Sequence, residues 1–152
     1  METMKSRTPK KSVIGLVCGG EGAEHAVDLI SVAEVRSGFD PDRYAVIILA
    51  IDKAGNWHFG READDCIRYA DRIDRVELIM SAPIVDLLPA GKIRNRATGE
   101  YLAAVDIFFP ITDDPVQEML AAAGKPYVGS PPDGIALCRD KDASKRVFSE
   151  AG

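Results

Sequence analysis

The feature that most constrains the fold is a strand, a glycine-rich turn, a helix and a second strand near the start of the chain. Residues 13–17 form a short continuous apolar run, typical of a strand buried on both faces. Residues 44–51 are rich in β-branched side chains and predict a second buried strand. Between them, apolar residues recur at helical spacing at Ala23, Val27, Ile30 and Ala33. This order is a βαβ unit, so the two strands should be parallel.

The second half of the sequence also alternates between predicted strands and predicted helices. Residues 105–109 predict a third central strand that Pro110 ends, and residues 116–123 predict a helix. Residues 93–102 predict a hairpin, and residues 57–59 a short edge strand. Further segments complete the prediction: a surface helix at 64–75, a short strand at 127–129, a helix from Pro132 and a last helix containing Ala143, Val147 and Ala151. We therefore predict an α/β fold whose open, mainly parallel, Rossmann-like sheet carries a hairpin insertion.

Charge and length exclude several classes of protein. Lys and Arg total 19 against 24 Asp and Glu in 152 residues, for a net charge of −5. That balance argues against a nucleic-acid-binding domain and against a polybasic membrane anchor. No uncharged apolar run approaches the ~18 residues of a membrane span. We expect one globular domain with neither nucleic acid nor membrane as a partner.

The cysteines and the N-terminal segment indicate a cytoplasmic protein. The three cysteines, Cys18, Cys66 and Cys138, are widely spaced and form no C-x-x-C pair, which argues against a disulfide framework or a zinc site. Residues 1–12 are basic and polar, and no apolar signal region follows them. We interpret residues 1–12 as a flexible leader.

Gly19, Gly20 and Gly22 lie between the first strand and its helix and form a candidate ligand loop. Glycine permits close backbone approach, and a helix N-terminus offers free N–H groups to an anion. Neither a P-loop nor a G-x-G-x-x-G pattern is present in this turn. A tight strand-to-helix connection and a ligand loop therefore remain equally open.

Glu24 and His25 fall in the predicted first helical turn. A carboxylate there complements the helix dipole, which is the ordinary structural explanation. The functional alternative places Glu24 at the carboxyl edge of the sheet, where it pairs with a substrate ammonium group. With only two histidines and no positioned nucleophile, a catalytic triad is not expected.

Two charged clusters can each be explained either structurally or functionally. Residues 140–146 are best interpreted as a solvated helix start, against a lysine aimed at a nucleotide phosphate. Asp113 and Asp114 precede Pro115 and favour a turn over a metal site. We predict no metal site.

The chain also resembles a known family in five segments that occur in the same order. They are IGLVCGGEGAEHAVDLISVAEV, YAVIILAIDKAGNWHFG, VDIFFPI, VQEMLAAAGKPYVGS and ALCRDKDASKRVFSEAG. Together they resemble the N-terminal part of bacterial D-alanine–D-alanine ligases, which belong to the ATP-grasp superfamily. The resemblance implies a pre-ATP-grasp domain of an enzyme that joins two D-alanines for peptidoglycan through an acyl phosphate. It also implies ATP and Mg²⁺ in the full-length enzyme, a homodimer and a cytoplasmic location.

The resemblance assigns roles to single residues. Glu24 matches the glutamate that holds the ammonium group of the first D-alanine, beside His25, and Lys141 matches the lysine that contacts the ATP phosphates. Residues 127–130 resemble the turn before the linking helices. The implied division is a substrate domain over 13–138 and the start of a linker helix over 139–152, leading to an ATP-grasp domain.

The chain departs from the family pattern at several positions. Ala26 replaces a second glutamate, and Asp28 replaces a serine. Residues 112–116 replace a longer loop that carries a histidine, and Gln117-Glu118 replaces Gln-Gly.

These departures, and the absence of ATP-grasp sequence, set what we expect of the chain. We expect that this chain alone does not ligate D-alanine and binds neither ATP nor Mg²⁺ tightly. The alternative is a free-standing, degenerate domain that acts as a non-catalytic binding module. Another ATP-grasp peptide ligase, or an unrelated nucleotide-binding enzyme, is a third and weaker hypothesis.

Overall fold

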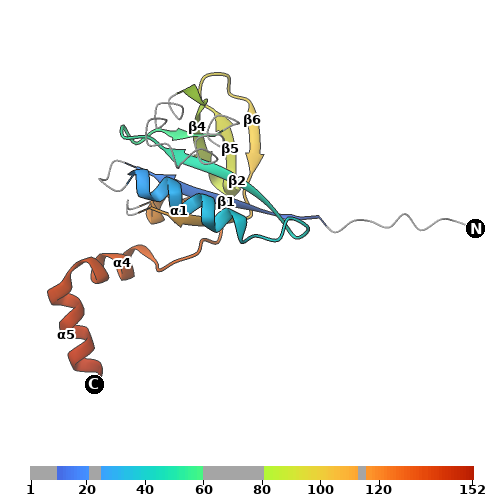
Figure 1. The fold of residues 1–152 in the computed structure, drawn as a ribbon. Coiled ribbons are helices and arrows are strands. Elements are labelled where there is room, and N and C mark those ends of the chain that lie inside the picture. The colour runs from blue at the N-terminus through green and yellow to red at the C-terminus, as the bar shows by residue number, and fades with distance from the viewer. Residues whose placement is uncertain (1–9, 21–24, 60–80, 113–115) are drawn as a thin grey trace, which may run out of the picture.

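The computed structural model describes residues 10–20, 25–59, 81–112 and 116–152 (Figure 1). The strands are β1 (Ser12–Gly19), β2 (Tyr44–Ile51), β3 (Trp57–His58), β4 (Ile84–Leu88), β5 (Lys92–Asn95), β6 (Tyr101–Ala104) and β7 (Ile107–Ile111). The helices are α1 (His25–Ser37), α3 (Gln117–Ala122), α4 (Pro132–Arg139), α5 (Lys141–Ala151) and the 3₁₀ turn η2 (Pro89–Gly91). The predicted helix at 64–75 lies outside the described residues.

The strands form one seven-stranded sheet in the order β6-β5-β4-β3-β2-β1-β7. β1 pairs in parallel with both β2 and β7, which confirms the βαβ prediction and the third parallel strand. The predicted central position of that third strand is wrong, because β7 is the last strand in the sheet order. From β2 to β6 every pairing is antiparallel. The predicted open α/β sheet and its hairpin, now β5 and β6, are confirmed. The sheet is mixed rather than mainly parallel, because β3 and β4 extend the antiparallel part beyond that hairpin.

Two details of the sheet correct the sequence-based prediction. The strand predicted at 57–59 is not an edge strand, because β3 pairs with β2 on one side and with β4 on the other. Two residues are too few to display the period of a buried strand. Pro110 does not end its strand, since it lies within β7 opposite Val17. β7 is the last strand in the sheet order, and an edge strand tolerates a residue without an N–H.

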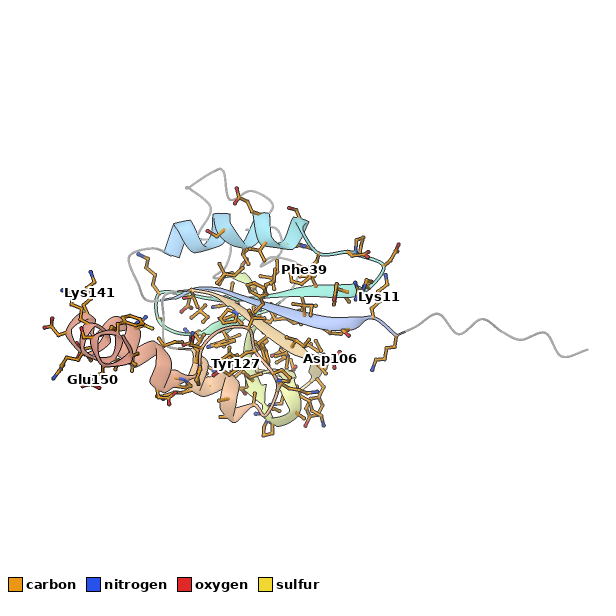
Figure 2. All side chains as sticks on the ribbon, turned by 90° about the horizontal axis from the view of Figure 1, so that it is seen from below. Lys11, Phe39, Asp106, Tyr127, Lys141 and Glu150 are labelled. Atoms are coloured by element: carbon orange, nitrogen blue, oxygen red, sulfur yellow. The ribbon has the colours of Figure 1, made fainter. Side chains whose placement is uncertain are left out.

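Helices cover both faces of the parallel part of the sheet. On one face, Leu16 and Ile48 pack with Val32 of α1, and the predicted apolar residue Ala33 packs against this cluster. On the other face, Val17 and Phe108 pack with Leu120 of α3. Figure 2 shows the sheet in section, with α1 on one side. This two-layer burial follows from the continuous apolar run of β1, because successive side chains point to opposite faces.

The C-terminal helices begin as predicted but lie apart from the sheet. α4 starts at Pro132, directly after Pro131, and α5 follows after Asp140. Neither helix has a buried residue, and Figure 1 shows both projecting from the body of the fold. The predicted strand at 127–129 is reduced to a single bridge between Phe108 and Tyr127. Gly124 follows Ala123, the C-cap of α3, at a φ of +67°, which is typical of a glycine just past a helix end.

Candidate functional site

The carboxyl ends of the parallel strands form the candidate site. Gly19 at the end of β1 is in register with Ile51 at the end of β2, so both strands end at the same edge. The Gly20 N–H donates to the Ile51 carbonyl oxygen at 2.9 Å. The Thr112 hydroxyl, just after β7, donates to the Gly19 carbonyl oxygen at 2.6 Å. The glycine turn is therefore tied to both neighbouring strands.

The backbone of this turn explains its glycines. Gly19 has a φ of +79° and Gly20 a φ of +131°, conformations that other residues rarely adopt. α1 then begins at His25, so its first N–H groups lie just beyond the turn in sequence. Ligands of open α/β folds bind at this edge of the sheet.

The structure places only part of the predicted substrate site. Gly19 and Gly20 lie at the carboxyl edge, as predicted. Gly22 and Glu24 lie outside the described residues. His25 is the first residue of α1, and its side chain is outside the described part of the chain. The roles assigned to Glu24 and His25 remain predictions.

Lys141, the predicted nucleotide contact, is the exposed first residue of α5. The preceding Asp140 caps this helix, since its side chain accepts from the N–H groups of Asp142 and Ala143 at 3.0 and 2.9 Å. This confirms the interpretation of the charged run as a solvated helix start. Figure 2 shows Lys141 at the end of the molecule toward which β1 runs, opposite Lys11. The contact of Lys141 with the ATP phosphates stays a prediction.

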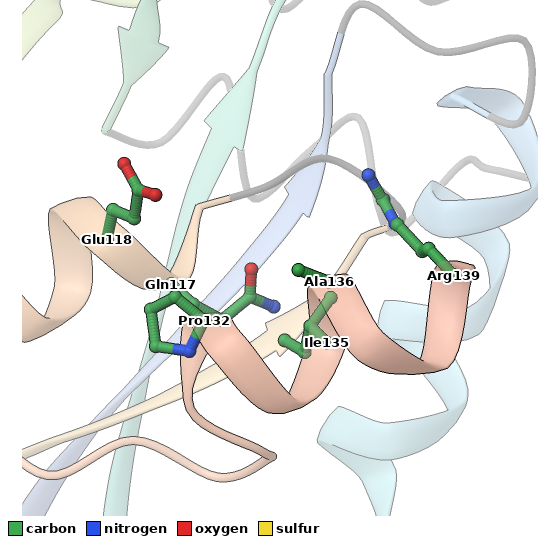
Figure 3. Close-up of a pocket in the computed structure, with 6 residues that line it drawn as sticks. All are labelled: Gln117, Glu118, Pro132, Ile135, Ala136 and Arg139. Atoms are coloured by element: carbon green, nitrogen blue, oxygen red, sulfur yellow. The ribbon is translucent and has the colours of Figure 1, made fainter. Parts of the chain in front are cut away.

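A pocket of about 160 Å³ lies between α3 and α4 (Figure 3). Glu118 on α3 and Arg139 at the end of α4 lie on opposite sides of it. Its other lining residues are Gln117, Pro132, Ile135 and Ala136. The pocket thus combines one carboxylate, one guanidinium and an apolar wall. Sequence analysis flagged Gln117 and Glu118 only as departures from a family pattern and did not single out Arg139.

Sequence analysis also missed a buried polar pair at the end of β2. Asp52 is 3% exposed and His58 is 1% exposed, and the His58 Nε2 lies 2.9 Å from the Asp52 Oδ2. Burial raises the pKa of the Asp52 carboxyl, but hydrogen bonds from His58, Asn56 and Ala54 outweigh burial and lower it from 3.8 to about 2. The available signal was an Asp before a Lys-Ala-Gly-Asn turn, which is typical of side-chain-to-backbone hydrogen bonding.

The described residues offer neither a metal centre nor a membrane span. Across the described ranges, no three His, Cys, Asp or Glu side chains gather closely enough to hold a metal ion. No helix within those same ranges has the length and apolarity needed to cross a bilayer. His58 is too deeply buried to reach a ligand at the sheet edge.

Comparison with known proteins identifies similar sequences. Residues 13–130 match the family model described as D-ala D-ala ligase N-terminus. The chain is 36% identical over 148 residues to D-alanine–D-alanine ligase A of Salmonella typhimurium, covering 91% of this chain and 40% of that protein. It is 35% identical over 152 residues to the Escherichia coli K12 protein of the same name, covering 94% and 42%. The chain thus spans about two fifths of the length of these relatives.

Solved structures show the same fold. The D-alanine–D-alanine ligase of Coxiella burnetii superposes with a TM-score of 0.78 at 24% identity, over 93% of this chain and 42% of that one. The VanG D-Ala:D-Ser ligase of Enterococcus faecalis gives a TM-score of 0.73 at 23% identity, over 94% and 43%. At these identities the likeness concerns the fold alone.

Proposed function

The chain belongs to the family described as D-ala D-ala ligase N-terminus, and from that membership we propose that it is the substrate-side domain of a D-alanine–D-alanine ligase. The match over residues 13–130 carries this proposal. The glycine turn supports it, because Gly19 and Gly20 lie at the carboxyl edge of the sheet and precede α1 in the sequence. In this proposal Glu24 binds the ammonium group of the first D-alanine, and His25 lies beside it.

Ligation requires groups that bind the ATP phosphates and the metal, in addition to the residues that we assign to the D-alanine site. Transfer of a phosphoryl group needs cations placed around the phosphates and the metal, together with a positioned acceptor. The 152 residues align with about two fifths of the relatives' length. We propose that ATP and Mg²⁺ are bound mainly by residues outside the aligned part, with Lys141 reaching the phosphates from α5. The isolated chain is then expected to be inactive as a ligase.

A chimera tests the proposal directly. The 152 residues are fused to the part of the Salmonella typhimurium relative that lies beyond the matched segment, and D-alanine-dependent ADP release is measured. We expect activity from the chimera and none from the isolated chain. E24Q should raise the KM for D-alanine by about tenfold or more, since a charge-assisted hydrogen bond is lost. As a matched control, E100Q removes an exposed carboxylate from the loop between β5 and β6.

Two outcomes count against the proposal. One is a chimera that shows native-like circular dichroism and cooperative unfolding yet releases no ADP. The other is an active chimera in which E24Q and E100Q behave alike, which would remove Glu24 from the site. K141A should separately raise the KM for ATP, because one phosphate contact is lost.

The short connection after β7 favours a second candidate function. β7 ends at Ile111 and α3 begins at Gln117, so residues 112–116 alone join them. This is where the resemblance implies a longer, histidine-bearing loop. The second candidate is therefore a non-catalytic domain that binds a small amino acid or a protein. A folded but inactive chimera whose isolated domain still binds D-alanine in calorimetry would favour it.

We also propose a homodimer in the cytoplasm, with D-alanine as the ligand and with neither nucleic acid nor membrane as a partner. The acidic balance, with a net charge of −5, supports the exclusion of nucleic acid. Light scattering on the chimera should give twice the mass of one chain. A monomer at micromolar concentration would contradict the dimer.

A further inference from the structure

The ring of His58 lies between two oxygen atoms. Its Nδ1 is 2.9 Å from the Ala82 carbonyl oxygen, and its Nε2 is 2.9 Å from the Asp52 Oδ2. A backbone carbonyl oxygen can only accept a hydrogen bond, and so can an ionised carboxylate. A neutral imidazole carries one N–H and would therefore turn a bare lone pair toward one of these oxygens. At 1% exposure no bulk water relieves that contact.

The surroundings of Asp52 require its ionised form. Its Oδ1 accepts from the backbone N–H groups of Ala54 and Asn56 at 2.8 and 2.9 Å. Its Oδ2 accepts from the Asn56 side-chain amide at 3.1 Å as well as from His58. Four donors thus converge on two oxygens, which is an arrangement for a carboxylate and leaves no acceptor for a carboxyl proton.

The residues that pair with His58 in the sheet are uncharged. In the sheet, His58 stands opposite Ala50 of β2 and Ile84 of β4. Lys53, next to Asp52 in the turn, is exposed. In the described part of the chain, Asp52 supplies the charged group that bonds the ring.

We propose that His58 is a doubly protonated imidazolium in the folded chain and that its ion pair with Asp52 is a clamp at the centre of the sheet. β3 consists of Trp57 and His58 alone, and it joins the parallel strands to the antiparallel ones. The clamp fastens this short strand to the β2 turn through Asp52 and to the segment before β4 through Ala82.

This inference concerns the fold, so it stands or falls independently of the proposed ligase function.

Nitrogen-15 NMR of the whole 152-residue chain tests the protonation state directly. A long-range proton–nitrogen correlation at neutral pH should show a bonded proton on both ring nitrogens of His58. H25Q assigns the spectrum, because the chain has two histidines. One bare ring nitrogen at neutral pH in the folded chain would overturn the proposal.

D52N provides a matched variant. Its amide oxygen can still accept from Ala54 and Asn56, and its amide nitrogen can donate to His58 Nε2. A neutral His58 then keeps Nδ1–H for Ala82, so the variant should show one protonated ring nitrogen. D140N serves as the control, because it changes the exposed carboxylate that caps α5.

Hydrogen exchange reports whether the clamp opens. The Phe59 N–H donates to the Pro83 carbonyl oxygen at 3.2 Å, beside the clamp. At neutral pH, its protection should be about tenfold higher in the wild type and in D140N than in D52N, because D52N lacks the ion pair. Equal protection in all three proteins would overturn the clamp. If D52N fails to fold, the wild-type nitrogen spectrum alone decides.

Discussion

The Thr112 hydroxyl donates a 2.6 Å hydrogen bond to the Gly19 carbonyl oxygen and so joins residues 93 positions apart in sequence. The bond ties the chain just after β7 to the last residue of β1, at the edge where the candidate site lies. It holds the glycine turn from one side, while Gly20 holds it from the other through the Ile51 carbonyl oxygen. The shape of the turn therefore depends on strands that follow it in the sequence.

Removing the Thr112 hydroxyl should destabilise the fold at the carboxyl edge of the sheet. T112V keeps the side-chain volume but removes the donor, so we expect a loss of about 1 kcal/mol in the free energy of unfolding. T112S keeps the donor and should lose less. Urea unfolding of the three proteins checks this. Equal stability of T112V and the wild type would show that the hydrogen bond contributes nothing net.

Asp52 should make the chain sensitive to acid. Its pKa of about 2 in the fold lies below the ordinary 3.8, so the unfolded chain takes up the proton first. The resulting stabilisation of about 2 kcal/mol is complete above about pH 4 and is lost as the pH falls toward 2. Urea unfolding across that range should show this loss. D52N has no such carboxyl, so an unchanged acid slope in D52N would contradict the prediction.

Gly91 should not tolerate a side chain. It has a φ of +69°, and an added Cβ would lie 2.4 Å from the Val105 carbonyl oxygen. G91A should destabilise the fold by about 2–4 kcal/mol, from backbone strain and the clash together. G99A is the matched control, because Gly99 has a φ of +74° with nothing within 4 Å of its Cβ position. Strain alone should make G99A about 1 kcal/mol less stable. Equal effects in thermal unfolding would remove the clash from the explanation.

Two neighbouring residues of α3 should respond differently to truncation. Leu120 is fully buried against the sheet, whereas Met119 is 48% exposed. L120A should lower the free energy of unfolding by about 2–5 kcal/mol through lost burial and a residual cavity. M119A should lower it by about 0.5 kcal/mol. Chemical denaturation checks both, and a similar loss in the two variants would contradict the packing of α3.

Part of the candidate site was predictable because local pattern controls it. The glycines after the first apolar strand predicted a turn at the carboxyl edge, and Gly19 and Gly20 lie there. The charged run at 140–146 predicted a helix start, and Asp140 caps α5. Sequence pattern could not predict that Arg139 and Glu118 line one pocket, because that depends on how α4 lies relative to α3.

Local sequence pattern was sufficient to predict the βαβ unit, the hairpin and the helix ends, since each depends on apolar periodicity or on Gly and Pro within a few residues. Three features depend instead on long-range packing: the internal position of β3, the presence of Pro110 within β7, and the pairing of Asp52 with His58. The order of strands in a sheet is set by packing between segments that are far apart in sequence. The buried Asp52 keeps its charge only through the hydrogen-bond donors that the completed fold brings within reach.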